Sequence, residues 1–399
     1  MNKLRSFALY LTKFPRIKSI LKYLYFRISL IFYKKKYSYK TKYPISEIKK
    51  GENFGGYYDR VISNNEIVVF HQIPKDINIS NSIKIYANDL HLGSSLSWNW
   101  QQGTLLKMIS SNEVIYNDIK GHKLISIIKN YKENKTREVP YPFYEYDEDK
   151  ATLYGIDFKR LSKYSKDYGY YTPFESNIRD DDAIFSYNVN ELKYSSLVPY
   201  SRLHQLTSNR DVKSEFVNHL LLSPDKNKFI FIYRRRSVNN ELISSLVLYD
   251  LEINEASLIV DEKLVSHCCW FDNTTIIGWF RYNGKIAYHK LNIYSGENEI
   301  IGETSINSDG HPSISKNQKW MITDTYPDNS RMSKLILFDL VSNESKELGV
   351  FFSPLKFYGN KRCDLHPRIC HESNSITFDS THTGKRKVYK MYLKDIKLN

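Results

Sequence analysis

Cysteine is scarce in this 399-residue chain, which has four, at positions 268, 269, 363 and 370. No two of them have the Cys-x-x-Cys spacing of a zinc ribbon or a thioredoxin-type redox site. Neighbouring residues of a strand point to opposite faces, so Cys268 and Cys269 are expected to be packing residues. A small secreted domain stapled by disulfides uses cysteine differently, which favours a cytoplasmic protein or one on the cytoplasmic face of a membrane.

Several catalytic signatures are also missing. There is no Gly-x-Ser-x-Gly elbow, which excludes a serine hydrolase gated by an attached domain. No nucleotide-binding motif is present, so no nucleotide cofactor is expected and glycosyl transfer ranks last among the possible activities. The Ser-x-Asp-x-Gly-x-Thr-Trp turn of sialidases is absent as well.

Acidic residues are nearly absent from the first 50 residues, which contain fourteen Lys or Arg and one acid, Glu47. This segment therefore carries +13 of the net charge of +14, and the other 349 residues are almost balanced. Because the basic excess is confined to one end and no recognition motif accompanies it, nucleic acid is not an expected partner.

Within this basic segment, apolar residues recur at helical spacing from Ile17 to Ile31, and Pro15 suits the first turn of a helix. Uncharged runs such as residues 28–33 are too short to span a bilayer, and the charges interrupt the apolar core that a signal peptide needs. We expect residues 1–50 to form a basic amphipathic segment on an anionic membrane surface. A helix packed on the rest of the protein or an unstructured basic tail are the alternatives.

The remaining residues, 51–399, contain a repeat in which a histidine is followed by a turn and an apolar strand. Its clear copies begin at His219, His267, His311 and His366, at steps of 48, 44 and 55 residues. Four strands in roughly 45 residues are typical of a β-propeller blade. Weaker copies at Tyr57, at residues 101–104 and at Phe143 bring the number to seven. We predict an all-β, seven-bladed β-propeller of four-stranded antiparallel blades, with an insertion around residues 159–201.

The repeat also predicts which side chains meet. The first strand of each blade lines the central channel, so the four histidines would converge at one end, together with residues at the end of each second strand. Imidazoles from several blades can bind a divalent metal, transfer protons, or serve only as blade-to-blade contacts. Arginine binds carboxylates through paired hydrogen bonds, which favours an acidic ligand. Arg362 and Arg368 flank His366 and are the best candidates for this role.

Several phrases resemble a known family: residues 54–59 (Phe-Gly-Gly-Tyr-Tyr-Asp), 98–103 (Trp-Asn-Trp-Gln-Gln-Gly), 309–312 with 323–328, and 362–368 (Arg-Cys-Asp-Leu-His-Pro-Arg) with 378–386. The family comprises seven-bladed propellers that are similar to oligogalacturonate lyases and TolB-type propellers, and its members are often associated with bacterial surface-polysaccharide or capsule biosynthesis. The resemblance extends from about residue 53 to residue 393.

In oligogalacturonate lyases a manganese ion is held by histidines and a glutamine at the propeller mouth, and a uronic-acid chain is cut by β-elimination. The resemblance implies His311 and His366 as metal ligands, and His219 and His267, which are in phase with them, are predicted as further ligands. This chain departs from the family pattern, because Cys363 and Arg368 stand where that pattern has a glutamine and a second histidine.

The leading hypothesis is a carbohydrate-active propeller that cleaves an acidic bacterial polysaccharide, or its lipid-linked precursor, by β-elimination at the inner face of the cytoplasmic membrane. Arg362, Arg368 or one divalent metal, preferably manganese, would neutralise the substrate carboxylate, and His311 or His366 would transfer the proton. Asp324 and Asp379 would orient these histidines, and Tyr326 or His382 would protonate the leaving oxygen. The expected substrate-binding residues are Tyr57, Tyr58, Asp59, Trp98, Asn99, Gln101, Gln102, Arg234 and Arg281.

Two other functions fit the same residues. One is a non-catalytic propeller that binds glycan or organises a polysaccharide assembly complex. The other is a glycoside hydrolase that uses Asp324 and Asp379 as paired carboxylates.

Overall fold

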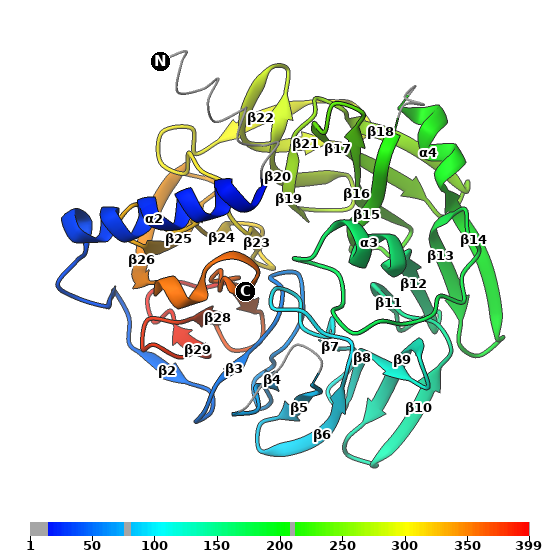
Figure 1. Cartoon of the computed structure of the whole chain (residues 1–399), viewed down its shortest axis with the longest axis horizontal. Coiled ribbons are helices and arrows are strands. Elements are labelled where there is room, and N and C mark those ends of the chain that lie inside the picture. The colour runs from blue at the N-terminus through cyan, green and yellow to red at the C-terminus, as the bar shows by residue number, and fades with distance from the viewer. Residues whose placement is uncertain (1–14, 76–80, 208–211, 399) are drawn as a thin grey trace.

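The computed structural model describes residues 15–75, 81–207 and 212–398. Seven antiparallel sheets surround a central axis, and Figure 1 shows the ring nearly face-on. The predicted all-β, seven-bladed propeller is confirmed. Each predicted copy of the repeat lies in or beside the innermost strand of a blade.

The first three blades use short inner strands. Blade 1 contains β3 (Asn53–Phe54), β4 (Val69–Gln72), β5 (Ile83–Ala87) and β6 (Leu90–Ser95). Blade 2 contains β7 (Lys107–Met108), β8 (Glu113–Lys120), β9 (Lys123–Asn130) and β10 (Lys135–Val139). Blade 3 contains β11 (Glu145–Asp147), β12 (Thr152–Ile156), β13 (Asp182–Asn188) and β14 (Lys193–Pro199).

The other four blades carry the repeat histidines. Blade 4 contains β15 (Val212–Leu222), β16 (Lys228–Ser237), β17 (Leu242–Asp250) and β18 (Glu255–Val260), and blade 5 contains β19 (Val265–Trp270), β20 (Thr275–Tyr282), β21 (Lys285–Asn292) and β22 (Asn298–Ile301). Blade 6 contains β23 (Ser313–Ile314), β24 (Trp320–Asp324), β25 (Met332–Asp339) and β26 (Glu344–Phe352). Blade 7 contains β27 (Arg368–Cys370), β28 (Ser375–Ser380) and β29 (Lys387–Tyr392).

The basic segment 1–50 supplies two strands to the ring. β2 (Ile45–Glu47) pairs with β29 and is the outer strand of blade 7, so this blade is built from two distant parts of the chain. β1 (Tyr39–Thr41) pairs with β26 and gives blade 6 a fifth strand. Four-stranded blades are therefore the rule, and blade 6 departs from it. Both strands cover what would otherwise be an exposed sheet edge.

The helix α2 (Pro15–Tyr33) precedes these strands and lies across one face of the ring, over the strands of blade 6 (Figure 1). Ser29 Oγ donates a hydrogen bond of 2.8 Å to the carbonyl of Asn329, and the Phe26 ring contacts Tyr358. Among the described residues, no helix is both long enough and apolar enough to cross a membrane.

A long connection between β12 and β13, residues 157–181, overlaps the first half of the predicted insertion of residues 159–201, whose second half is β13 and β14 of the regular blade. It begins with α3 (Phe158–Tyr164), which Asp157 caps by accepting a hydrogen bond from the backbone N–H of Arg160. The rest of the connection crosses toward the axis, while β13, β14 and α4 (Tyr200–Leu206) return to the regular blade. On the other side of the axis, the link from β26 to β27 forms two 3₁₀ turns, η2 (Leu355–Phe357) and η3 (Gly359–Lys361). These two loops meet over the channel.

The core consists of apolar layers between neighbouring blades. The largest layer joins blades 2, 3 and 4 and includes Phe143, Phe185 and Phe229, all fully buried. A second layer joins blades 6 and 7 around Phe351 and Phe378. Because each blade packs on both neighbours, the inner strands are held rigidly and their channel-facing side chains have defined positions.

Candidate functional site

Four histidines from four consecutive blades lie side by side at one end of the channel. We call His219, His267, His311 and His366 the histidine arc. Ring centroids are 5.7 Å apart between His219 and His267, 4.2 Å between His267 and His311, and 4.4 Å between His311 and His366. Each residue is only 1–2% exposed. The convergence predicted from the repeat is therefore present.

Irregular backbone at the inner strands directs these imidazoles toward the axis. The register of β15 shifts between Asn218 and Leu221, and that of β19 shifts between Val265 and Cys268, so His219 and His267 each lie at a β-bulge. His219 and His366 also adopt positive φ angles of 52° and 44°. Bulges and left-handed residues of this kind re-aim a side chain at the cost of local strain, and they are common beside functional sites.

Asp324, at the end of β24, holds two members of the arc. Its Oδ1 accepts hydrogen bonds from both the backbone N–H (2.9 Å) and Nδ1 (2.8 Å) of His311. Its Oδ2 accepts the backbone N–H of His366 in the next blade, at 3.0 Å. One buried carboxylate thus fixes the orientation of the His311 ring and the position of His366.

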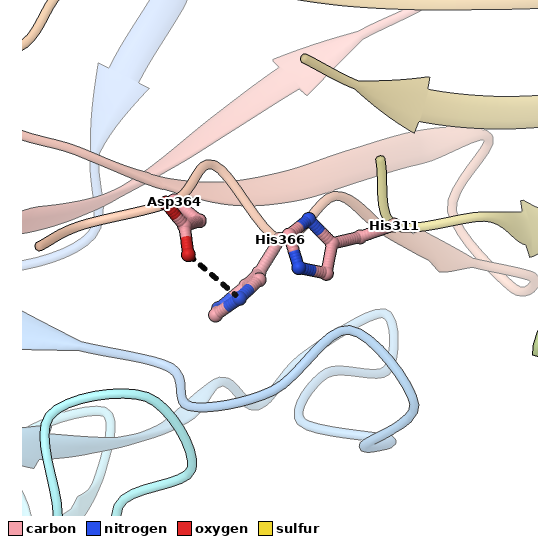
Figure 2. Close-up of side chains that lie close together, drawn as sticks. All are labelled: His311, Asp364 and His366. Atoms are coloured by element: carbon pink, nitrogen blue, oxygen red, sulfur yellow. Dashed lines mark ion pairs between the residues drawn. The ribbon is translucent and has the colours of Figure 1, made fainter. Parts of the chain in front are cut away.

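His311, Asp364 and His366 form a cluster that we call the triad. Their potential ligand atoms all lie within 4.8 Å of one another, and this is the one such group in the part of the chain that the structure describes. Figure 2 shows the three side chains facing one another, with Asp364 and His366 contributed by the same loop before β27. Oδ2 of Asp364 lies 4.0 Å from Nε2 of His366.

The hydrogen bonds of the triad leave one nitrogen of each ring free. Nδ1 of His311 faces Asp324 and Nδ1 of His366 faces the carbonyl of Gly56 at 3.0 Å, so each Nδ1 is the donor. The two Nε2 atoms are buried and have no hydrogen-bond partner among the described residues. Imidazole nitrogens oriented through Nδ1, together with a carboxylate, are the donor set that many divalent metals prefer. The residues present fit a divalent cation.

The two imidazoles of the triad have opposite proton affinities. Burial lowers the pKa of His366 well below its usual value, and the nearby His311, Arg368 and Arg362 lower it further. Burial also opposes charge on His311, but the carboxylates of Asp324, Asp364 and Asp309 outweigh this and raise its pKa. Of the two imidazoles, His311 therefore holds a proton more readily and His366 favours the neutral form.

The other half of the arc differs in its partners. His267 Nδ1 donates to Oδ1 of Asp309 at 3.0 Å, and burial lowers the pKa of His267 despite this carboxylate. His219 stacks on the Tyr57 ring at 5.2 Å, and burial lowers its pKa well below the usual value. Neither residue belongs to the triad, although both were predicted as metal ligands.

Tyr57 fills the centre of the arc. Its ring lies 4.8–6.3 Å from all four histidine rings, and its hydroxyl is 3.5 Å from Nε2 of His219. Tyr58 follows it down the channel, where its hydroxyl donates to the carbonyl of Cys268 at 2.8 Å. Both of these predicted substrate-binding residues are buried, and Tyr58 lines the cavity at the opposite end of the channel.

Above the triad lies a pocket of about 320 Å³, the upper pocket. Of the triad, Asp364 lines this pocket, whereas His311 and His366 do not. Arg362 joins Asp364 to the insertion through Nε–Asp364 (2.7 Å) and Nη1–Asp167 (2.8 Å) contacts. Tyr326 also lines the pocket and packs edge-on against His311 at 5.8 Å. Desolvation of the Tyr326 phenol, assisted by Asp364, raises its pKa well above the usual value, so the phenol keeps its proton.

Arg368 and Asp379 form an ion pair of 3.1 Å beneath the arc. Arg368 also donates to the carbonyls of Gly56 and Tyr57, while Asp379 accepts the backbone N–H of Gly55 at 2.9 Å. Asp379 thus links blade 7 to blade 1 in the way that Asp324 links blade 6 to blade 7. These contacts are structural, and neither residue lines the upper pocket.

Other predicted site residues lie in the surroundings of the arc or outside it. His382 packs between Tyr39, Phe351 and Tyr389 on the outer side of blades 6 and 7, away from the triad. Arg234 donates to Asn218 and Ser244, and Arg281 lies at the end of β20. The remaining residues brace loops: Gln101 donates to the carbonyl of Arg362, Gln102 to the Tyr144 hydroxyl, Asn99 to the carbonyl of Tyr168, and Trp98 to the carbonyl of Asn81.

The opposite end of the channel forms a second cavity of about 640 Å³, the lower cavity. Asp59 lies here with Arg60, Glu145 and Lys107. The Arg60 guanidinium contacts Asp59 at 3.0 Å and Glu145 at 3.1 Å, and Lys107 contacts Glu145 at 2.6 Å. The charged side chains Asp59, Arg60, Glu145 and Lys107 of the lower cavity are therefore paired with one another.

Sequence reasoning missed three residues that shape the site. Asp364 stands two positions before His366, and alternate residues of an extended segment point the same way, so the Asp-x-His spacing was an available signal. Asp309 stands two positions before His311, but it accepts a hydrogen bond from His267 in the preceding blade. Asp167 comes from the insertion, and its approach to Arg362 depends on a loop path that has no sequence signature.

Comparisons with known proteins relate this fold to solved β-propeller structures. An oligogalacturonate lyase in complex with manganese aligns over 91% of this chain and 96% of its own, with a TM-score of 0.64 and 12% identity. An oligogalacturonate lyase from Vibrio parahaemolyticus aligns over 90% and 97%, with a TM-score of 0.61 and 10% identity. TolB from Acinetobacter baumannii has a TM-score of 0.42 at 10% identity over 83% of this chain and 81% of its own, too distant to bear on the site.

Sequence comparison adds nothing to the structural likeness. No family model matches the sequence, and no curated protein matches it either. In fold, the chain is a seven-bladed β-propeller similar to the oligogalacturonate lyases.

Proposed function

We propose that this protein is a carbohydrate-active propeller enzyme that cleaves an acidic bacterial polysaccharide, or its lipid-linked precursor, by β-elimination. The observation that carries the proposal is the triad, a buried group of two imidazoles and a carboxylate beside a pocket that also contains an arginine. The likeness of the fold to oligogalacturonate lyases supports the same reaction class. A surface-polysaccharide pathway is part of this proposal.

His311, Asp364 and His366 would hold one divalent metal, with manganese the first to test. When bound, such an ion would polarise the carboxylate of a uronate unit and acidify the adjacent C–H group. Since His311 and His366 would then be ligands, the proton-transfer role predicted for them passes to another member of the arc.

The remaining steps use the chain's own groups. Arg362 would bind the substrate carboxylate in place of Asp167, its exposed partner. His267 would accept the proton, because its pKa is lowered and Asp309 fixes its ring through Nδ1. Tyr326 would donate its proton to the leaving glycosidic oxygen as the carbon–oxygen bond breaks, which leaves a double bond in the sugar ring.

The same proposal includes a location. The paucity of cysteine favours the cytoplasm, and the basic residues 1–50 favour contact with an anionic membrane surface. We place the protein at the inner face of the cytoplasmic membrane, with the part of residues 1–50 that precedes β1 as the membrane-contacting part of the chain, and with β1, β2 and residues 51–399 as the propeller.

One observation favours a second candidate, a glycan-binding propeller without catalytic activity. His311 and His366 are 1% and 2% exposed, so the triad would then tie blades 6 and 7 together while the upper pocket binds a sugar. Hydrolysis by Asp324 and Asp379 is not carried forward, because both carboxylates are engaged by backbone N–H groups of neighbouring blades.

Elimination produces an unsaturated uronate that absorbs ultraviolet light. We expect this absorbance to appear when the protein is incubated with uronate-containing glycans and Mn²⁺, and to be lost in His366→Ala. His371→Ala, which changes an exposed histidine at the lower cavity, is the matched control. An absence of product from uronate and capsule glycans, with glycan binding unchanged in His366→Ala, would replace the lyase by the binding propeller.

A further inference from the structure

The outer side of α2 exposes a continuous apolar stripe. Ile20, Leu24 and Ile28 are 60%, 46% and 57% exposed. The same stripe continues through Ile17, Leu21, Ile31 and Phe32, which are 49%, 42%, 78% and 76% exposed. At about 3.6 residues per turn these positions share one side of the helix. A contiguous stripe of this kind differs from scattered surface residues and marks an interaction surface.

Specific contacts on the opposite side of α2 fix the direction of this stripe. Ser29 bonds to the carbonyl of Asn329, and the Tyr25 hydroxyl bonds to its side chain at 3.3 Å. Phe26 packs edge-on against Tyr358 at 5.7 Å and lies under the Arg331 guanidinium at 5.3 Å. Because polar and aromatic contacts hold the helix on the ring, the apolar stripe faces away from the propeller.

The charge around the stripe identifies its partner. Lys22, Arg27 and the run Lys34, Lys35 and Lys36 are exposed, and no acidic residue precedes Glu47 in the chain. A basic helix with a large apolar face suits the interface of an anionic bilayer, where apolar residues enter the acyl boundary and lysines meet the headgroups. A purely apolar groove of a protein would leave these charges unpartnered.

α2 is also part of the wall of the upper pocket. Lys22 and Phe26 line this pocket together with Tyr326, Arg362 and Asp364. Figure 1 shows α2 on the face of the ring that also carries the loop with η2 and η3. The stripe and the pocket therefore belong to the same face of the propeller.

We propose that α2 inserts its apolar stripe into an anionic bilayer and thereby turns the upper pocket toward the membrane. This proposal adds an orientation to the membrane contact proposed above. It rests on the proposed function only for the identity of the substrate. With the pocket against the bilayer, the ligand that reaches Arg362 and the triad is one carried at the membrane surface, such as an acidic glycan linked to a lipid.

Sedimentation with vesicles tests the interface. The full chain is expected to bind vesicles of phosphatidylglycerol and phosphatidylcholine, and to bind pure phosphatidylcholine more weakly. Leu24→Glu with Ile31→Glu should weaken binding about 100-fold, because two inserted aliphatic side chains are replaced by charges. Leu192→Glu with Val341→Glu is the matched control, since these residues are 70% and 78% exposed in the β13–β14 turn of blade 3 and the β25–β26 turn of blade 6, outside α2, and it should bind normally. Equal binding by the α2 variant, or no binding by the full chain, overturns the proposal.

Hydrogen exchange on the vesicle-bound protein tests the orientation. Protection is expected in residues 15–33 and 355–361, and not at the lower cavity in residues 107–111 and 221–226. The opposite pattern overturns the proposal. Cleavage of a soluble uronate glycan should be the same in Leu24→Glu with Ile31→Glu as in the unchanged chain. If no glycan is cleaved by either, the proposed function fails while vesicle binding and exchange still decide the inference.

Discussion

The two ends of the channel differ in how their polar groups are satisfied. The lower cavity is about twice as large, 640 against 320 Å³, yet its buried charges are paired with one another through Arg60, Asp59 and Glu145. At the upper end, the Nε2 atoms of His311 and His366 are buried without a partner. Buried polar atoms without a hydrogen bond also occur elsewhere among the described residues, including Asp59 Oδ1 and Arg60 Nε of the lower cavity, but those two atoms face each other as an ion pair at 3.0 Å. The two imidazole nitrogens lie beside one carboxylate, and this donor set, not the cavity volume, marks the upper end as the candidate site.

The strongest test of this difference is Arg60→Ala. Arg60 is 2% exposed, and its removal would leave Asp59 and Glu145 buried without their shared cation. We expect a loss of about 3–5 kcal/mol in the free energy of unfolding. Arg362→Ala at the upper pocket should cost less, about 1–3 kcal/mol, because it leaves one buried carboxylate, Asp364, without its cation, while the other partner, Asp167, is partly exposed. Urea titration of both variants measures the difference, and equal losses would mean that the two ends are built alike.

Metal affinity should change only when residues at the upper end of the channel are substituted. His366→Ala removes one of three ligands and is expected to weaken Mn²⁺ binding by about 100-fold or more. His371→Ala at the lower cavity should leave the affinity unchanged. Isothermal calorimetry compares them, and the same affinity in both variants would remove the triad from consideration as a metal site.

The pH dependence of metal binding follows from the raised pKa of His311. A metal must displace the proton that Asp324, Asp364 and Asp309 hold on this ring, whereas His366 is already neutral. Affinity should therefore rise about tenfold per pH unit until the pH passes the raised pKa of His311, with about one proton released below it. Calorimetry in two buffers of different ionisation enthalpy counts the protons. Asp324→Asn should move the rise to lower pH, and an unchanged profile would contradict this role for Asp324.

The raised pKa of His311 also determines how this residue changes the stability of the fold with pH. Because the folded pKa of His311 lies above its unfolded value, its pairing with Asp324 stabilises the metal-free fold fully below the unfolded pKa. That contribution disappears as the pH rises through the folded pKa. The contribution of His311 alone should accordingly fall over the pH range in which the affinity for metal rises, whereas the buried His219, His267 and His366, whose pKa values are lowered, contribute in the opposite direction.

The smallest expected effect concerns Asp167, the partner of Arg362 over the upper pocket. Asp167→Asn should lower stability by less than about 1 kcal/mol, since the pair is partly exposed. A contact of this strength corresponds to about a fivefold change in rate, so a chelator should remove bound metal several-fold faster. Asp149→Asn, which removes an exposed partner of Lys226, is the control and should leave the removal rate unchanged.

The propeller ring could be predicted from the sequence because strand periodicity and the repeat histidines indicate where the inner strands of the blades lie. The sequence also predicted that the histidines meet, since equivalent positions of successive blades lie side by side. The strands β1 and β2 were hidden in the basic segment, because three-residue strands at a sheet edge need little apolar patterning. Their place depends on pairing partners more than 300 residues away.

The site was less predictable than the ring, for reasons of side-chain direction. His382 follows β28 by two residues, and nothing in the sequence shows that the chain turns its ring outward onto Tyr39 instead of toward the axis. Asp379 and Asp324 occupy the same place in successive blades, yet only Asp324 also contacts a ring of the arc. The repeat predicted the position of each aspartate in its blade, and the loop geometry decides which of the two aspartates contacts a histidine of the triad.

The pairing of β2 with β29 also determines when the ring can close during synthesis of the chain. Ser46 pairs with Lys390, so 344 residues separate the two halves of this contact. At a synthesis rate of about 5–20 residues per second, roughly 20–70 s pass between their emergence from the ribosome. The ring stays open during that interval, while α2 has already left the exit tunnel. A nascent chain can therefore reach a lipid surface before its last blade exists, and closure of the ring becomes the final step of maturation.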